Sequence, residues 1–193
     1  MSTARIIERQ PLALPEDWTA QEAAEHMGLR GFVETRLFTA SGDLALHRIG
    51  KNLITFIGDQ YYGERAAGIG TPPNQVTGMK LGTCGSTVVS KTGAGAGIVT
   101  YLSGSQRTMD GGVPTSANNS GSRRIQWKST WAAGVATNSA INEAVITNQT
   151  ALADNTSLEA VVKSRAAAVA LGTINKGAND TLEITWSHDL LGS

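Results

Sequence analysis

The sequence predicts a mainly β protein: an antiparallel β-sandwich, jelly-roll-like, with one or two short helices and an extended N-terminal arm. Three observations predict this fold class. Glycine is abundant, at 22 of 193 residues, and turn formers at this density suit short strands with many turns. Segments near the C-terminal end alternate apolar and polar residues, as half-buried strands do. Finally, 40% of residues are hydrophobic and only 17% are charged, which favours a packed core over disorder.

We expect residues 1–31 to form the arm and residues 32–193 to form the sandwich domain. Pro11 keeps the beginning of the arm extended, because its ring fixes φ and restricts the residue before it. Thr19 and Glu22 have the spacing of a capping box, which predicts one short helix within the arm. The arm has few apolar residues, so it is expected to become ordered by packing on another surface.

The sandwich domain is expected to open with a hairpin. Residues 32–39 and 44–49 alternate well, and the Ala-Ser-Gly-Asp sequence at 40–43 is a good hairpin turn. Apolar residues then recur at helical spacing, which predicts a short helix that ends at Gly63 or Gly68.

A long glycine-rich stretch follows, from residue 68 to residue 122. Short strands are expected within it at 75–81 and 98–102. A long irregular stretch in a compact domain is often functional or ordered by a partner. This stretch is therefore a candidate contact region.

The clearest strand pattern lies in the C-terminal half. Residues 124–131 and 181–187 each alternate polar side chains with large apolar ones. The polar turn at 175–180 connects the last of these to the run at 166–174. Two runs joined by such a turn predict an antiparallel hairpin.

Composition also bears on the class of partner. Sixteen Lys and Arg balance sixteen Asp and Glu, whereas a protein that binds duplex nucleic acid concentrates positive charge. No apolar run is long enough to span a membrane. The first residues include Arg5 and Glu8 and no apolar segment of the signal-peptide type. We therefore expect no nucleic acid and no membrane among the partners, and synthesis in a cytoplasm.

Motifs that would carry chemistry are weak. His26, His47 and His188 lie in separate elements, whereas a histidine metal site usually brings two close together; His188 is expected to satisfy the end of its strand. The glycines at 93–97 precede a strand-like run rather than a helix, so they predict a turn and not a phosphate loop. Cys84 stands between glycines, but no histidine is adjacent to act as its base. We expect no catalytic, cofactor or metal-binding residues, and no enzyme activity.

The alternating segments place Trp127, Trp131 and Trp186 on apolar strand faces. Such an aromatic stripe is most often sandwich core or a subunit interface. A sugar-binding platform is the alternative.

From residue 73 onward the chain resembles a family of virion proteins encoded by tailed bacteriophages, including cyanophages. The matching stretches are MKLGTCGST (79–87), KTGAGA (91–96), YLSGS (101–105), TWAAG (130–134), INEAV (141–145), NKGANDTL (175–182) and TW (185–186). They cover roughly the last 120 residues, in the order expected for the family. Cys84 stands where the family pattern has glycine, and the first 70 residues carry no match.

The resemblance implies a capsid cement or decoration protein. Such a protein would form a homotrimer on the virion surface, bind the outside of the major capsid protein shell and stabilise it. The alternative is a tail or neck fibre, or a host-recognition module with a carbohydrate-binding surface. Contacts are expected from residues 11–32 and 82–115. The individual interface residues predicted are Pro11, Trp18, Phe32, Tyr101, Arg107, Trp127, Trp131 and Trp186.

Overall fold

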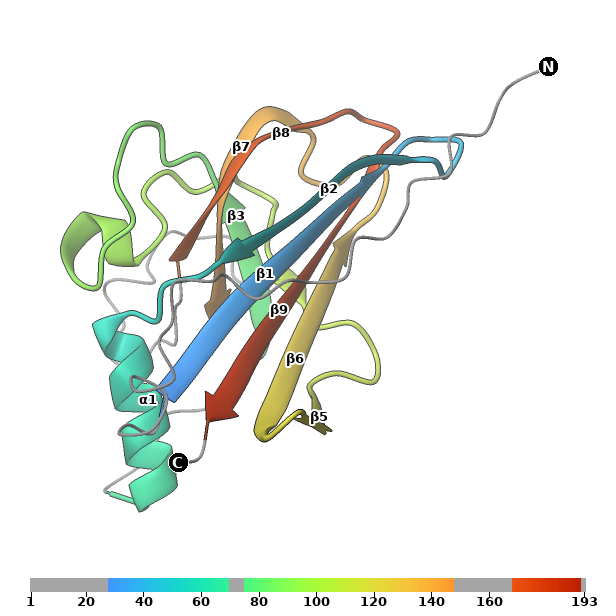
Figure 1. Ribbon diagram of the computed structural model, residues 1–193. Coiled ribbons are helices and arrows are strands. Elements are labelled where there is room, and N and C mark those ends of the chain that lie inside the picture. Colours follow the sequence, from blue (N-terminus) through green and yellow to red (C-terminus); the bar gives the residue numbers. More distant parts are fainter. Residues whose placement is uncertain (1–27, 70–74, 148–167, 192–193) are drawn as a thin grey trace.

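Two antiparallel sheets face each other in the computed structural model, which describes residues 28–69, 75–147 and 168–191 (Figure 1). The front sheet has the strand order β2-β1-β9-β6-β5, and the back sheet has the order β4-β3-β7-β8. This arrangement confirms the predicted β-sandwich. The strands are β1 (Gly28–Phe38), β2 (Leu44–Lys51), β3 (Gly78–Gly82), β4 (Arg107–Thr108), β5 (Thr115–Asn119), β6 (Ser122–Trp131), β7 (Asn138–Thr147), β8 (Ala168–Lys176) and β9 (Thr181–Leu191).

Strands β1 and β2 form the predicted hairpin, with Phe38 paired to Leu44 next to the turn. Strand β1 begins at Gly28 rather than at Phe32, so the last residues assigned to the arm belong to the front sheet. They pair with the end of β9, where Gly28 lies opposite Leu191. The predicted arm helix lies outside the described residues.

Helix α1 (Phe56–Ala67) confirms the predicted helix and follows the front hairpin. It begins where Thr55 caps it, because the Thr55 hydroxyl accepts the amide of Gly58 at 3.1 Å. It ends at Gly68, which adopts the left-handed conformation with φ of 62°. Of the two predicted end points, Gly68 is the correct one.

The predicted C-terminal hairpin is wrong, although both of its strands exist. Strand β8 pairs with β7 in the back sheet, whereas β9 lies between β1 and β6 in the front sheet. The turn between them therefore crosses from one sheet to the other. The buried Lys176 ammonium holds this crossing, because it donates to the carbonyls of Asp180 at 2.7 Å and Ala132 at 3.1 Å.

The segment at 98–102 is not the predicted strand. Tyr101 forms one isolated bridge with Gly82, and Ile98 is buried against Val145 of β7. The glycine run before it forms a short 3-10 helix, η1 (Gly93–Ala96), rather than a turn leading into a strand. This part of the glycine-rich stretch lies over the outer side of the back sheet instead of joining it.

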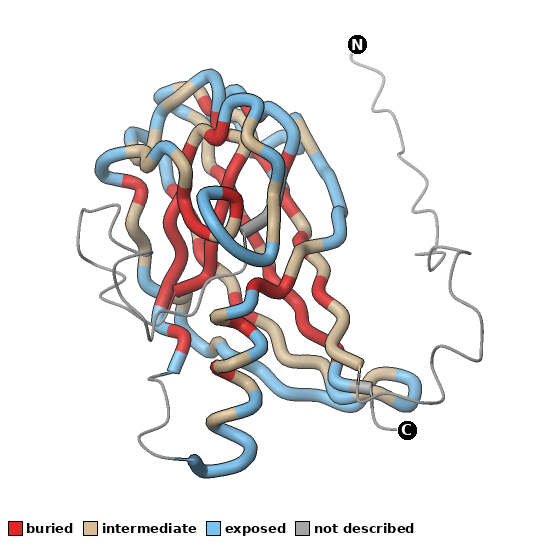
Figure 2. Tube along the Cα trace, turned by 90° about the vertical axis from the view of Figure 1, so that its left-hand side faces the viewer, coloured by how far each residue is buried: buried red, intermediate tan, exposed pale blue. Residues whose placement is uncertain are grey.

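The space between the sheets holds one large apolar core, and buried residues follow the strands of both sheets (Figure 2). Its largest members are Trp131 and Trp186, which are fully buried. The Trp131 indole N–H donates to the Ser105 carbonyl at 2.6 Å, so its polar atom is satisfied within the core.

Candidate docking surface

The predicted interface residues are not brought together. Pro11 and Trp18 lie outside the described residues. Phe32 is half-buried on β1 of the front sheet, whereas Arg107 is half-buried on β4 of the back sheet. Tyr101 is half-buried in the loop over the back sheet, where its hydroxyl donates to Gln106 at 2.7 Å.

The three tryptophans predicted as interface residues belong to the core of the chain itself. Trp127 is 5% exposed, and Trp131 and Trp186 are 0% exposed. Side chains this deeply buried between two sheets cannot contact a partner while the sandwich is folded. Their burial also removes the exposed aromatic platform that sugar binding requires of them.

A different surface stands out at one end of the sandwich, which we call the loop end: residues 83–97 together with the first turn of α1. Two large apolar side chains project from it, Val88 at 80% exposed and Phe56 at 62% exposed. Figure 1 shows this loop reaching beyond the sheets beside the start of the helix. The sequence analysis placed the loop within its contact region but named neither Val88 nor Phe56.

Each of these two side chains had a local signal. Val88 belongs to a stretch of small polar residues and glycine in which Lys91 is the one charged residue, so no strand or helix buries it. Phe56 follows the helix cap directly. A side chain in the first turn faces away from the core unless the apolar stripe of the helix includes it.

Backbone contacts order the loop end. The Phe56 amide donates to the Lys91 carbonyl at 2.9 Å, and the Lys91 ammonium pairs with Asp59 of α1 at 2.6 Å. Within the loop, the Ser90 amide donates to the Gly95 carbonyl at 3.1 Å. A Cβ at Gly95 would lie 2.1 Å from the Val88 carbonyl oxygen. Glycine is therefore required where the two arms of the loop touch.

A hollow of about 380 Å³ lies beside the loop end. Its lining residues are Cys84, Gly85, Ser86, Thr87, Val88, Val89, Asn142, Gly172 and Thr173. The Asn142 side-chain oxygen accepts the Cys84 amide at 2.7 Å and ties the loop to β7. The hollow is uncharged on all sides, and it offers apolar and hydrogen-bonding surface to a partner rather than a site for an ion.

Cys84 is a poor nucleophile in this setting. Burial raises the pKa of its thiol, and the negative charge of Glu143 raises it further. A raised pKa keeps the thiol protonated, whereas the thiolate is the reactive form. The Glu143 carboxylate is itself used in structure, because it accepts the Val99 amide at 2.7 Å and holds the covering loop on β7.

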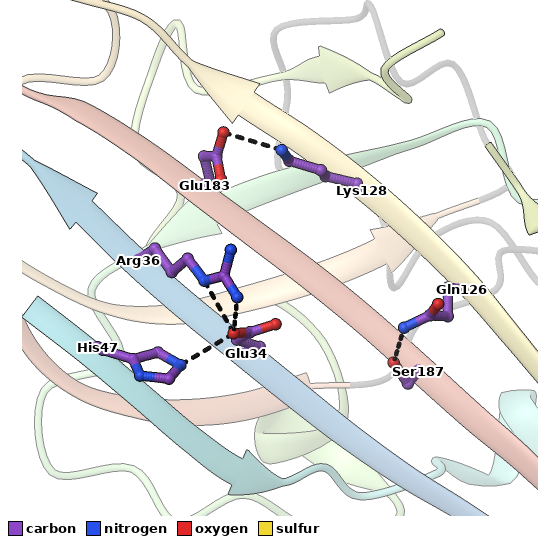
Figure 3. A network of polar contacts seen from close by, with 7 residues as sticks. All are labelled: Glu34, Arg36, His47, Gln126, Lys128, Glu183 and Ser187. Carbon is purple, nitrogen blue, oxygen red and sulfur yellow. Dashed lines mark hydrogen bonds and ion pairs between the residues drawn. The ribbon is translucent and has the colours of Figure 1, made fainter. Parts of the chain in front are cut away.

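The outer face of the front sheet carries a second surface, made of paired polar side chains (Figure 3). Glu34 accepts from Arg36 at 2.8 Å and contacts His47 at 2.9 Å. Lys128 pairs with Glu183 at 2.8 Å. These groups are partly exposed and satisfy one another along and across the strands, as on a solvated sheet face.

A third feature joins the two sheets at one side of the sandwich. The Arg48 guanidinium on β2 donates to the carbonyls of Leu171 at 2.9 Å and Thr173 at 3.1 Å on β8. Gly172 lies between these carbonyls with φ of 65°, and the β7–β8 register shifts there. Because β2 and β8 are edge strands, this contact closes the side of the sandwich where neither strand has a further neighbour.

Within the described ranges, no group of three His, Cys, Asp or Glu side chains is placed to hold a metal ion. His188 lies inside β9 and is 1% exposed, rather than at the strand end where it was expected. Of the helices that the structure describes, none is long and apolar enough to cross a membrane. The chain matches no protein-family model, no curated protein and no solved structure.

Proposed function

We propose that this chain is a structural protein of a tailed-bacteriophage virion, a capsid cement or decoration protein that binds the outside of the major capsid shell. The resemblance in the last 120 residues or so supports the family. The observation that carries the proposal is the loop end, where Val88 and Phe56 are exposed on an ordered, nearly uncharged loop.

Exposed apolar side chains with no charged neighbours are typical of protein-protein contacts. The centre of such an interface is depleted in charge, and its apolar anchors fill pockets on the partner. The loop end offers two such anchors and a hollow beside them that a partner side chain can fill. A flat shell built of many identical subunits presents the same receiving surface at every site.

The remaining properties of the chain are compatible with this role. A formal net charge of zero gives no long-range attraction to packaged DNA. A protein that binds only the expanded shell stabilises that state by mass action. We extend the proposal to a homotrimer, in which three loop ends would contact neighbouring capsid subunits together and gain avidity.

Copy number tests the proposal directly. Quantitative gel densitometry of purified virions compares this chain with the major capsid protein. Cement that covers the shell predicts a copy number comparable with that of the major capsid protein. A copy number far below it would overturn the proposal and favour the alternative, a tail, neck or fibre component.

A binding assay then tests the loop end. Particles that lack this protein are mixed with the purified chain and sedimented. Val88→Asp is expected to abolish co-sedimentation, because it places a charge in the apolar contact. The matched control is Leu44→Asp, an exposed apolar position on β2 at 43% exposure, which is expected to bind as the unchanged chain does. Equal binding by both variants would exclude the loop end as the contact.

A further inference from the structure

His188 connects helix α1 to the front sheet through a set of buried hydrogen bonds. Its Nδ1 is hydrogen-bonded to the Tyr62 hydroxyl on α1. Its Nε2 lies 3.0 Å from the Trp186 indole nitrogen and 3.1 Å from the Asn52 side-chain nitrogen. The Trp127 ring meets the imidazole edge-on, with centroids 5.2 Å apart. One ring thus joins β9, β6, α1 and the segment before the helix.

The indole of Trp186 determines the tautomer of His188. An indole N–H can donate and cannot accept, so Nε2 of the imidazole must present its lone pair. In the neutral ring the hydrogen is therefore on Nδ1, where it points to the Tyr62 oxygen. The side-chain amide of Asn52 must likewise present its nitrogen to Nε2.

Asn52 is held in place from its other side. Its backbone amide donates to the Gly31 carbonyl at 3.0 Å, and a Cβ at Gly31 would lie 1.5 Å from the Asn52 side-chain oxygen. If His188 acquired a hydrogen on Nε2, Asn52 could turn its amide and offer that oxygen. Trp186 has no such second orientation, because its one polar atom is a donor.

We propose that His188 is a pH-sensitive pin for helix α1. When a proton is added to Nε2, its N–H faces the Trp186 N–H, two donors meet without an acceptor, and the cluster separates. Helix α1 then leaves the front sheet, because Tyr62 is its bonded contact to this ring. The proton comes from solvent, and no covalent bond changes.

The charged groups around this ring belong to other contacts. Asp189 and Arg124 lie on the opposite face of the front sheet, since alternate strand residues face opposite sides, and they bind each other at 2.7 and 2.8 Å. Arg30 faces the same side, opposite Asp189 in the register. On α1, Arg65 lies over the Tyr61 ring at 5.6 Å. Tyr62 is the titratable side chain bonded to His188.

Release of α1 would reach the loop end. The helix supplies Phe56 itself, and its first turn holds Lys91 through the contacts described above. Acidification would therefore loosen the docking surface while leaving both sheets in place. This consequence for docking rests on the proposed function; the release of the helix does not.

Hydrogen exchange of the full chain, followed by mass spectrometry, tests the pin. Samples are compared at about pH 7.5 and about pH 5, the interval in which histidine takes up a proton, with intrinsic exchange rates corrected. Peptides of α1 are expected to lose protection several-fold more than peptides of β7. Equal changes in α1 and β7 would overturn the proposal.

Histidine variants identify the group responsible. His188→Gln is expected to remove the pH dependence of α1 protection, whereas His47→Gln and His26→Gln are expected to keep it. Loss of the effect in either control variant would overturn the assignment to His188. Should His188→Gln not fold, nitrogen NMR of the unchanged chain decides: a neutral His188 with its hydrogen on Nε2 contradicts the pin. None of these measurements needs a virus particle, so their failure is distinct from failure of the proposed function.

Discussion

The two sheets of the sandwich share one core but differ in their outer faces. On the front sheet, buried and half-exposed residues alternate along β1, β6 and the first half of β9. On the back sheet, all five residues of β3 are buried, and so are the last five of β7. The difference arises because the loop from residue 83 to residue 106 covers the outer side of the back sheet. A sheet covered on both sides loses the alternation by which strands are recognised.

The strongest test of this comparison places a charge on the outer side of each sheet. Val145→Asp on β7 puts a carboxylate where Val145 and Ile98 pack, at 0% and 3% exposed. We expect a loss of at least about 3 kcal/mol in the free energy of unfolding, because a buried charge without a partner is costly. Urea denaturation measures the loss.

The matched change on the front sheet is Thr185→Asp. Thr185 lies opposite Lys128 on the polar face, so the new carboxylate remains hydrated and faces a cation. We expect a change within about 0.5 kcal/mol, as for most surface substitutions. Equal losses from the two variants would show that the back sheet is not covered as described.

A second prediction concerns the attachment of the covering loop. Glu143→Gln removes the charge that accepts the Val99 amide, and we expect it to cost about 1–2 kcal/mol in urea denaturation. The same change should lower the pKa of Cys84, since the Glu143 charge raises it in the unchanged chain. Alkylation of Cys84 by iodoacetamide should then begin at lower pH. Alkylation that begins at higher pH would contradict the assigned effect of Glu143.

A third prediction tests the contact between the edges of the two sheets. Gly172→Ala places a side chain at φ of 65°, 2.7 Å from the Arg48 guanidinium. We expect a loss of about 1–2 kcal/mol in thermal or urea unfolding, from backbone strain and displacement of Arg48. Adding Arg48→Ala should restore none of the backbone strain, so the double variant separates the two causes. Gly42→Ala, at φ of 86° with open space around it, is the control for strain alone.

The smallest effect is expected on the polar face. Lys128→Ala breaks the pair with Glu183, whose side chains are 34% and 23% exposed. Partly exposed ion pairs contribute little, so we expect a change below about 1 kcal/mol that shrinks further in high salt. A larger change that persists in high salt would mean that this face carries more stability than its exposure indicates.

Much of the front sheet could be predicted because its signals are local. The turn between β1 and β2, the cap of α1 at Thr55 and its end at Gly68 each depend on a few neighbouring residues. The alternation in β6 and β9 is equally local. The candidate docking surface was predicted only as a region, because the exposure of Val88 depends on what the rest of the chain leaves uncovered.

The sequence by itself determined the fold class, the strands with one polar face, and the helix with its two ends. Tertiary structure decided which strands pair and which surfaces are covered. Strands β8 and β9 are joined by a polar turn that would suit a hairpin, yet they enter different sheets. The side chains of β9 pack between β1 and β6, and that gain is non-local. Likewise, Trp127, Trp131 and Trp186 became core rather than interface because the second sheet covers them, which no periodicity in their own strands records.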